Sequence, residues 1–218
     1  MIAFKFIIIA VISYLLGSLN FGVILSRGMK NEDIRESGSG NAGTTNMMRT
    51  YGKTLGLLTI AGDILKVIIA IWLAFRIVSV EELKMTLDSA SDYPQVVLKS
   101  LAGLFAVLGH IFPCYFKFKG GKGVATSGGM VIAIDWRIAL ILLAIFALTI
   151  LITKYVSLGS ILMAIFYPVF IGIFYKDIIL VLIALVFTVI IVVAHRENVK
   201  RLINHTENKI GSKKKKKE

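Results

Sequence analysis

The chain has 218 residues, of which 56% are hydrophobic and only 17% are charged, and its mean hydropathy is +0.80. Soluble globular domains carry about 25% charged residues, so this composition excludes an ordinary soluble enzyme, and the length fits one domain. A single cysteine excludes an internal disulfide framework, and the net charge of +12 does not indicate nucleic-acid binding, because half of it lies between residue 196 and the C-terminus.

Seven apolar stretches predict an all-α integral membrane protein with about seven transmembrane helices. In chain order they are residues 6–25, 55–75, 96–112, 124–134, 138–152, 156–175 and 178–194. A full span takes about 20 residues, because the hydrocarbon core is about 30 Å thick. The fourth and fifth stretches are short, so we expect either two short helices that meet at residues 135–137 or a re-entrant hairpin. We predict one membrane domain, residues 1–211, and a basic cytoplasmic tail, residues 212–218.

The distribution of lysine and arginine predicts how the chain is oriented. One set of loops, together with the tail, carries 18 of the 25 basic residues. Cytoplasmic loops are enriched in lysine and arginine, so we expect the N-terminus outside and the C-terminus in the cytoplasm of a bacterial plasma membrane. The run Lys213 to Lys217 either only supports this topology or also binds anionic lipid headgroups.

The first polar cluster follows the first apolar stretch and reads SGSGNAGTTN from Ser37 to Asn46, with Arg49 three residues later. Glycines and small hydroxyl or amide side chains provide backbone N–H groups and hydroxyl donors, as in an anion-binding nest. A helix that begins near Thr45 would add its N-terminal dipole. We therefore interpret this segment as a phosphate-binding loop; the alternative is a flexible connection between two spans.

The second polar cluster reads KFKGGKGVATS from Lys117 to Ser127. Phe116 stands where a Walker A motif has its first glycine, and Gly123 replaces the Ser or Thr of that motif, so a nucleotide site is excluded. A lysine among glycines before a helix still suits a phosphate monoester. The alternative is a basic loop that only contributes to topology.

The third cluster, at the exit of the last span, contains His195 and Asn198, which would share a helix face. This histidine could act as a general base or hold a substrate hydroxyl, or the segment could be an ordinary polar helix end. Asp63 and Lys66 lie three residues apart inside the second span, and we interpret them as a structural pair. Ser157 and His110 lie near helix ends. Histidines and carboxylates show no metal-ligand spacing, so we expect no metal and no other cofactor.

Six segments in order resemble the bacterial acyl-phosphate:glycerol-3-phosphate acyltransferases of the PlsY type. These segments are residues 37–49, 62–66, 108–113, 118–126, 155–159 and 195–202, and they extend over nearly the whole chain. The resemblance implies transfer of an acyl group from acyl phosphate to the 1-hydroxyl of glycerol 3-phosphate. The products would be lysophosphatidic acid and inorganic phosphate. This reaction would be the first committed step of bacterial phospholipid synthesis.

The resemblance also assigns roles to residues. It implies that Ser39, Arg49, Lys122, His195 and Asn198 are catalytic. Acyl phosphate would be bound by the first loop, through Gly38, Ser39, Gly40, Asn41, Gly43, Thr44, Thr45 and Asn46. Glycerol 3-phosphate would be bound by Arg49, Gly121, Lys122, Gly123, Ser157, His195 and Asn198. Thr44 replaces the alanine usual in this family.

Two questions stay open at the level of the sequence. Either His195 or the leaving phosphate could accept the hydroxyl proton, because the second pKa of a phosphate monoester is about 6. A covalent acyl-Ser39 is disfavoured, since no Ser-His-acid arrangement is evident. The alternative function is a membrane transporter of a small phosphorylated metabolite, since polar, glycine-rich breaks in apolar helices also occur in transporters.

Overall fold

The computed structural model describes residues 2–87 and 90–210, and every regular element within them is helical. The basic tail, residues 212–218, including Lys213 to Lys217, lies outside the described residues. The α-helices are α1 (Ile2–Gly17), α2 (Phe21–Lys30), α3 (Thr44–Tyr51), α4 (Lys53–Ile77), α5 (Val80–Leu87), α6 (Pro94–Ile111), α7 (Val124–Ile134), α8 (Trp136–Thr153), α9 (Val156–Tyr175), α10 (Ile178–Ala194) and α11 (Arg196–Ile203). Two short 3₁₀ helices are η1 (Ile34–Glu36) and η2 (Cys114–Phe116).

Helices form in all seven apolar stretches, the first of which is divided between α1 and α2. Five segments within the described residues are long and apolar enough to cross a membrane. They are Ile2–Lys30, Lys53–Ile77, Pro94–Phe116, Trp136–Thr153 and Val156–Tyr175. A sixth is obtained if α10 and α11, which meet at a bend of 62°, form one span. The short helix is α7, with 11 residues, whereas α8 reaches 18 residues because polar end residues extend its apolar stretch. Of the two predicted short helices, therefore, only α7 is short.

The predicted meeting point of the fourth and fifth helices is confirmed at Asp135. This residue follows the last turn of α7, and its carboxylate accepts a hydrogen bond from the backbone N–H of Arg137 in the first turn of α8. A carboxylate at this position caps the free N–H groups of a helix N-terminus.

The first predicted helix, residues 6–25, is interrupted, which hydropathy alone did not indicate. Residues 18–20 separate α1 from α2, and the side chain of Asn20 caps the N-terminus of α2 by accepting from Val23 N. Ser18 and Asn20 are fully buried. The break exists because a capping residue starts a new helix inside an otherwise apolar stretch.

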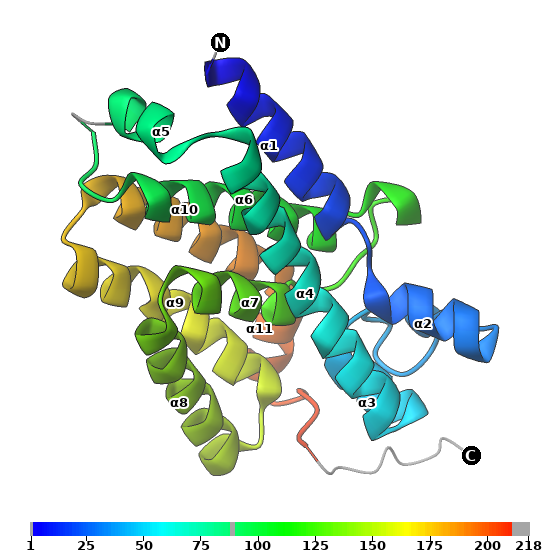
Figure 1. Ribbon diagram of the computed structural model, residues 1–218. Helices are drawn as coiled ribbons and strands as arrows, with labels where there is room; N and C mark the ends of the chain where they lie inside the picture. The colour runs from blue at the N-terminus through cyan, green and yellow to red at the C-terminus, as the bar shows by residue number, and fades with distance from the viewer. Residues whose placement is uncertain (1, 88–89, 211–218) are drawn as a thin grey trace, which may run out of the picture.

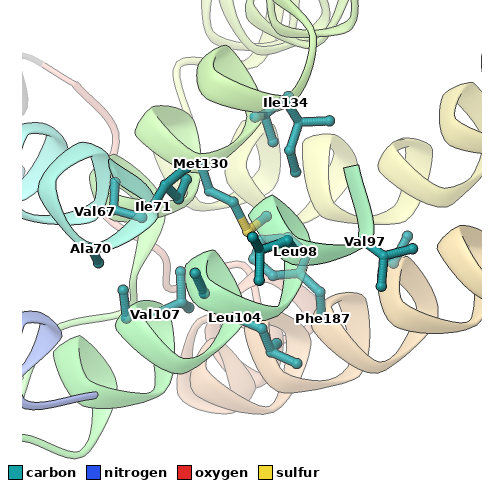
Figure 2. Packing of buried hydrophobic residues seen from close by; sticks show 14 of the residues in the cluster. Val67, Ala70, Ile71, Val97, Leu98, Leu104, Val107, Met130, Ile134 and Phe187 are labelled. Atoms are coloured by element: carbon teal, nitrogen blue, oxygen red, sulfur yellow. The ribbon is translucent and has the colours of Figure 1, made fainter. Parts of the chain in front are cut away.

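Helix α6 lies at the centre of the bundle and packs against α1, α4, α7 and α10. Figure 2 shows Val97, Leu98, Leu104 and Val107 of this helix with Met130 and Phe187 around them. The contact with α1 is especially close, because Cβ atoms added at Gly17 and Gly109 would lie 2.0 Å from Ala106 O and 2.1 Å from Tyr14 O. Small residues allow such close helix packing in membrane proteins.

The polar clusters gather at one end of the bundle, which we call the loop end. The direction of the chain brings to it the C-terminal ends of α1, α6, α8 and α10 and the N-terminal ends of α4, α7 and α9. Figure 1 shows α2 and α3 there, opposite the end at which the N-terminus and α5 lie. A small separate core, formed by Val23, Ile34, Ala42, Met47 and Leu55, anchors the first loop to the bundle.

Candidate active site

The first glycine-rich loop is organised around the side chain of Asn46. This amide is 1% exposed, accepts a hydrogen bond from Ser39 N at 2.9 Å, and donates to Ile34 O, Ser37 O and Asn41 O at 2.9–3.1 Å. Four backbone groups of the loop are thus held by one buried amide. Asn46 therefore shapes the loop, and its own polar atoms are occupied by the loop backbone.

Two glycines give this loop its tight turns. Gly38 and Gly40 have φ angles of 62° and 72°, a region in which residues with a Cβ are strained. A Cβ at Gly38 would also lie 2.1 Å from Asn46 Oδ1. Ser39, between the two glycines, is exposed, so its hydroxyl is accessible from the loop end. The N–H groups of Ser39 and Gly40, however, are bound within the loop, to Asn46 Oδ1 and Ser37 O, so the predicted nest of available backbone N–H groups does not form at these two residues.

Helix α3 begins at Thr44, next to the start near Thr45 that was considered for this loop. Gly43 precedes it and supplies no side-chain cap, so the first N–H groups of α3 are not capped by that residue. The hydroxyl oxygen of Thr44 is buried and has no hydrogen-bond partner among the described residues. Arg49 lies exposed on the last turn of the same helix. The loop thus combines uncapped N–H groups, hydroxyls and a nearby guanidinium.

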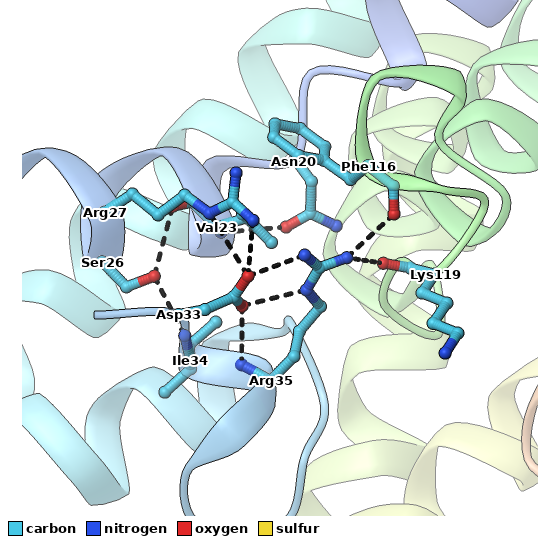
Figure 3. A network of polar contacts seen from close by, with 9 residues as sticks. All are labelled: Asn20, Val23, Ser26, Arg27, Asp33, Ile34, Arg35, Phe116 and Lys119. Carbon is cyan, nitrogen blue, oxygen red and sulfur yellow. Dashed lines mark hydrogen bonds and ion pairs between the residues drawn. The ribbon is translucent and has the colours of Figure 1, made fainter. Parts of the chain in front are cut away.

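Arg35 joins the first loop to the second loop, which is the segment between α6 and α7 that carries the second polar cluster (Figure 3). Its guanidinium donates to Phe116 O and Lys119 O, both at 2.9 Å, across 81 and 84 residues of sequence. Asp33 holds this guanidinium from the other side, with Nη2 and Oδ2 2.6 Å apart, and the hydrogen bonds from Arg35 hold the pKa of Asp33 well below its usual range. Arg27 also contacts Asp33, at 2.9 Å.

An open hollow of about 500 Å³ lies beside this network. It is lined by Arg27, Asn31, Glu32, Asp33, Glu36 and Ser37. Three carboxylates against one guanidinium make its lining unsuited to a phosphate. The cationic groups and N–H donors around the second loop and the third cluster are the better candidate for phosphate binding.

The second loop folds back onto the end of α6. Gly120 N and Gly121 N donate to Ile111 O and His110 O, each at 3.2 Å. Gly123 adopts a φ of 79° and precedes the first turn of α7. This arrangement places Lys122 directly before a helix N-terminus, where the dipole and free N–H groups favour an anion.

Lys122 lies within a group of polar side chains that come from four separate segments. Its ammonium donates to Asn198 Oδ1, and Asn198 Nδ2 donates to Glu207 Oε1 at 2.8 Å. Ser157 Oγ donates to the same carboxylate oxygen at 2.9 Å, and Arg201 Nε lies 2.7 Å from Oε2. Burial, together with the nearby Arg201 charge, lowers the pKa of Lys122 to about 8.

His195 lies at the bend between α10 and α11 and is 2% exposed. Its Nδ1 lies 2.8 Å from Ile191 O, and because a carbonyl can only accept, Nδ1 carries the proton in the neutral ring. Nε2 is then the basic nitrogen. Asn198 N donates to His195 O at 2.8 Å, so the two residues are held in one turn, as their spacing predicted.

The three predicted clusters are thus connected in a chain: Arg35 links the first loop to the second, and Lys122 links the second to the third. Within residues 2–87 and 90–210, no hydrogen bond joins Ser39 or Arg49 directly to Lys122. Ser157 contacts the third cluster through Glu207. In the same part of the chain, no group of three or more His, Cys, Asp or Glu residues could hold a metal ion.

Sequence reasoning missed two residues that organise the site, Arg35 and Glu207. Both lie among charged residues in polar loops, where either would be expected to be solvated. A pattern could have indicated Glu207, because it is an acid within a strongly basic segment. Nothing local distinguishes Arg35 from its neighbours, since both of its carbonyl acceptors are more than 80 residues away.

Comparison with known proteins identifies the family. The family described as glycerol-3-phosphate acyltransferase matches residues 7–205. The glycerol-3-phosphate acyltransferase of Clostridioides difficile (strain 630) is 42% identical over 97% of this chain and 98% of its own length. That of Bacillus subtilis (strain 168) is 41% identical over 93% and 96%.

Solved structures agree with the sequence relatives. The crystal structure of PlsY (YgiH), an integral membrane glycerol 3-phosphate acyltransferase, in its glycerol 3-phosphate form superposes with a TM-score of 0.81 at 34% identity, over 94% of this chain and 96% of that one. Its lysophosphatidic acid form gives a TM-score of 0.79 at 32% identity, over 94% and 95%. The predicted resemblance is confirmed, and the chain belongs to the PlsY-type family of integral membrane glycerol-3-phosphate acyltransferases.

Proposed function

We propose that this membrane enzyme transfers an acyl group from acyl phosphate to the 1-hydroxyl of sn-glycerol 3-phosphate. The products are 1-acyl-sn-glycerol 3-phosphate, which is lysophosphatidic acid, and inorganic phosphate. Relatives solved with glycerol 3-phosphate and with lysophosphatidic acid support the acceptor and the product. The observation that carries the proposal is the gathering of Lys122, Asn198, Ser157 and the His195 turn at the loop end.

In this proposal, glycerol 3-phosphate is bound by the second loop and the third cluster. The ammonium of Lys122 and the N-terminus of α7 attract its phosphate, and Gly121 and Gly123 let the backbone approach closely. Ser157 and Asn198, which both donate to Glu207, complete the polar lining, and His195 orients the glycerol hydroxyl. Arg49 approaches from α3 and adds a bidentate contact.

Acyl phosphate is bound by the first loop. The exposed hydroxyl of Ser39, between Gly38 and Gly40, and the uncapped N–H groups at the start of α3 surround the phosphate. Asn41, Gly43, Thr44 and Thr45 line the same cradle, and Asn46 keeps the loop in shape. The acyl chain extends among the membrane helices, where water is excluded.

The reaction is a direct transfer. The 1-hydroxyl oxygen attacks the carbonyl carbon of acyl phosphate, the bond from that carbon to the phosphate oxygen breaks, and phosphate leaves with the electron pair. The hydroxyl proton passes to His195 Nε2 or to the leaving phosphate, two routes that differ in their need for the imidazole. Holding both reactants in attacking geometry lowers the activation free energy by about 7–11 kcal/mol in well-oriented cases.

The proposed orientation puts the loop end in the cytoplasm and the N-terminus outside. The loop end carries the basic loops, and cytoplasmic loops are the basic ones. Glycerol 3-phosphate is a dianion near neutral pH and does not cross the hydrocarbon core, so a cytoplasmic site meets it without transport. The tail, Lys213 to Lys217, then faces the inner leaflet and binds its anionic lipids.

The test is release of inorganic phosphate by purified protein. Wild type should release phosphate from acyl phosphate only when glycerol 3-phosphate is present, with one lysophosphatidic acid formed per phosphate. Arg49→Ala should lose most of this activity. Arg76→Ala is the matched control and should keep it, because Arg76 lies in the last turn of α4, far from the loop end. Phosphate release that does not depend on glycerol 3-phosphate would overturn the proposal.

A further inference from the structure

A charged cluster lies inside the bundle, beneath the second loop. Asp63 and Lys66 of α4 and His110 of α6 are each at most 2% exposed. Lys66 Nζ lies 2.8 Å from Asp63 Oδ1 and 2.9 Å from His110 Nδ1. It also donates to Leu19 O at 2.9 Å, in the break between α1 and α2. The predicted pair between Asp63 and Lys66 is confirmed, but it has two further partners.

Lys66 thus forms an ion pair with Asp63, donates to a backbone carbonyl and contacts the imidazole of His110. His110 Nδ1 also lies 3.3 Å from Asp63 Oδ1, so both charged residues face the same ring nitrogen. Nε2 is directed toward the second loop.

That loop rests directly on His110. A Cβ added at Gly121 would lie 2.2 Å from His110 Nε2, and one added at Gly120 would lie 2.0 Å from His110 O. Gly121 N also donates to His110 O. The imidazole and the last turn of α6 thus support the two glycines that precede Lys122. A shift of this ring changes where the Lys122 ammonium points.

An ion pair alone does not account for this cluster. Removing two charges from water is costly, and the attraction between them offsets that cost only when further hydrogen bonds satisfy both groups. Ionisable residues inside membrane helices are costly and are usually functional. Here the additional contacts of Lys66 run to the α1–α2 break and, through His110, to the loop that carries Lys122.

We propose that Asp63, Lys66 and His110 are positioning residues for the reaction, acting through Gly121 to aim Lys122 at the phosphate of glycerol 3-phosphate. They do not touch substrate. The inference rests on the proposed binding role of Lys122. Substitution of these residues therefore raises KM for glycerol 3-phosphate, in addition to any effect on stability.

The test uses full-length purified protein and three changes. His110→Asn keeps an acceptor for Lys66 but has no atom at the Nε2 position beneath Gly121. We expect it to raise KM for glycerol 3-phosphate about tenfold or more, with KM for acyl phosphate changed by less than about twofold. His110→Gln, whose amide reaches the Nε2 position, should give an intermediate KM. The double change Asp63→Asn with Lys66→Met, which removes both charges, should act in the same direction as His110→Asn.

A matched control separates position from stability. Asp177 is buried at the opposite end of the bundle, where it accepts from Ser91 and caps α10 through Leu180 N. Asp177→Asn should lower Tm without raising KM for glycerol 3-phosphate. If His110→Asn and the double change lower Tm similarly but leave this KM unchanged, the cluster is only structural and the proposal is overturned.

A double-mutant cycle distinguishes this inference from the proposed function. Lys122→Gln alone should raise KM for glycerol 3-phosphate, and if it does not, the proposed role of Lys122 fails. In the Lys122→Gln background, His110→Asn should change KM by less than about twofold, because its effect passes through the missing ammonium. If the two effects multiply fully, His110 does not act through Lys122, and the inference is wrong while the proposed function stands.

Discussion

The ammonium of Lys122 donates to the side-chain oxygen of Asn198, although 76 residues separate them in the chain. This contact joins the loop before α7 to the first turn of α11, beyond the bend that follows α10. Asn198 is 5% exposed, and its amide nitrogen is bound to Glu207, so its orientation is determined from both sides. A loop that carries a cation and a helix that carries His195 are therefore held together by side chains of the protein itself.

The lowered pKa of Lys122 predicts how substrate binding depends on pH. With a pKa of about 8 in the free enzyme, the ammonium is charged below that pH and increasingly neutral above it. Because phosphate binds the charged form, kcat/KM for glycerol 3-phosphate should be flat up to about pH 8 and then fall, by up to about tenfold per pH unit. The phosphate monoester is already a dianion in this range, since its second pKa is about 6.

Lys122→Arg is the control for this pH profile. A guanidinium stays charged at every accessible pH, so the fall above pH 8 should disappear, at a lower overall activity because its geometry differs from that of an ammonium. Initial rates between pH 6.5 and 10, with acyl phosphate at saturation, provide the measurement. A wild-type profile that stays flat to pH 10 would contradict the role given to the lysine.

Arg35→Ala should separate the first loop from the second. The change removes the two hydrogen bonds to Phe116 O and Lys119 O and leaves Asp33 without its closest partner. We expect kcat/KM to fall about tenfold or more, because reactants bound on separate loops lose their alignment. The matched change Arg27→Ala removes an exposed guanidinium that contacts the same carboxylate and lies 5.7 Å from the centre of the Phe116 ring. Within the described residues it donates no hydrogen bond to the second loop, so this variant should lose less activity than Arg35→Ala. Equal losses in both variants would show that charge, and not the connection between loops, matters.

Glu207→Gln should destabilise the protein by about 1–2 kcal/mol, because hydrogen bonds to charged groups are stronger than neutral ones. Burial alone raises the pKa of Glu207, but hydrogen bonds from Arg201, Asn198 and Ser157 outweigh it and hold the pKa below its usual 4.5. A depressed carboxyl pKa contributes stability above about pH 4.5 that is lost as pH falls through the folded-state value. The stability difference between wild type and variant should therefore narrow as the pH falls below 4.5.

Thermal unfolding in detergent at several pH values measures this effect. Glu197→Gln is the matched control, since its carboxylate is exposed and pairs only with exposed neighbours, Arg196 and Lys200. Surface pairs contribute about 0–1 kcal/mol, so this variant should unfold close to wild type. If the two variants have the same Tm, Glu207 does not hold the third cluster together.

Gly109→Ala should destabilise the bundle by about 1–3 kcal/mol, because an added Cβ would lie 2.1 Å from the backbone oxygen of Tyr14 and the helices cannot separate locally. Gly128→Ala is the matched control on α7, where nothing lies within 4 Å of the added atom. It should be neutral or stabilise by up to about 1 kcal/mol through helix propensity. Thermal unfolding of both variants measures this difference. An unchanged Tm for Gly109→Ala would show that α1 and α6 are not tightly packed.

Much of the architecture could be predicted because membrane helices are specified locally. A run of apolar residues must hydrogen-bond its own backbone in a bilayer, so hydropathy and length locate helices without knowledge of their partners. The junction of the fourth and fifth helices, expected at residues 135–137 from the interruption of the apolar pattern, lies at Asp135. The break at residues 18–20 was missed, because a buried Asn20 cap lies within a stretch whose average hydropathy remains high.

The amino-acid sequence by itself determined the class of protein, the helical segments, the three polar clusters and, through ordered motifs, the family. Only the tertiary structure decided which polar groups meet: Arg35 with the second loop, Glu207 with Ser157 and Asn198, and Lys66 with His110. The physical reason is that hydropathy and capping act over a few neighbouring residues. The partner of a charged side chain, in contrast, is chosen by the packing of the helices, which brings Lys66 to His110 across 44 residues and Arg35 to Lys119 across 84.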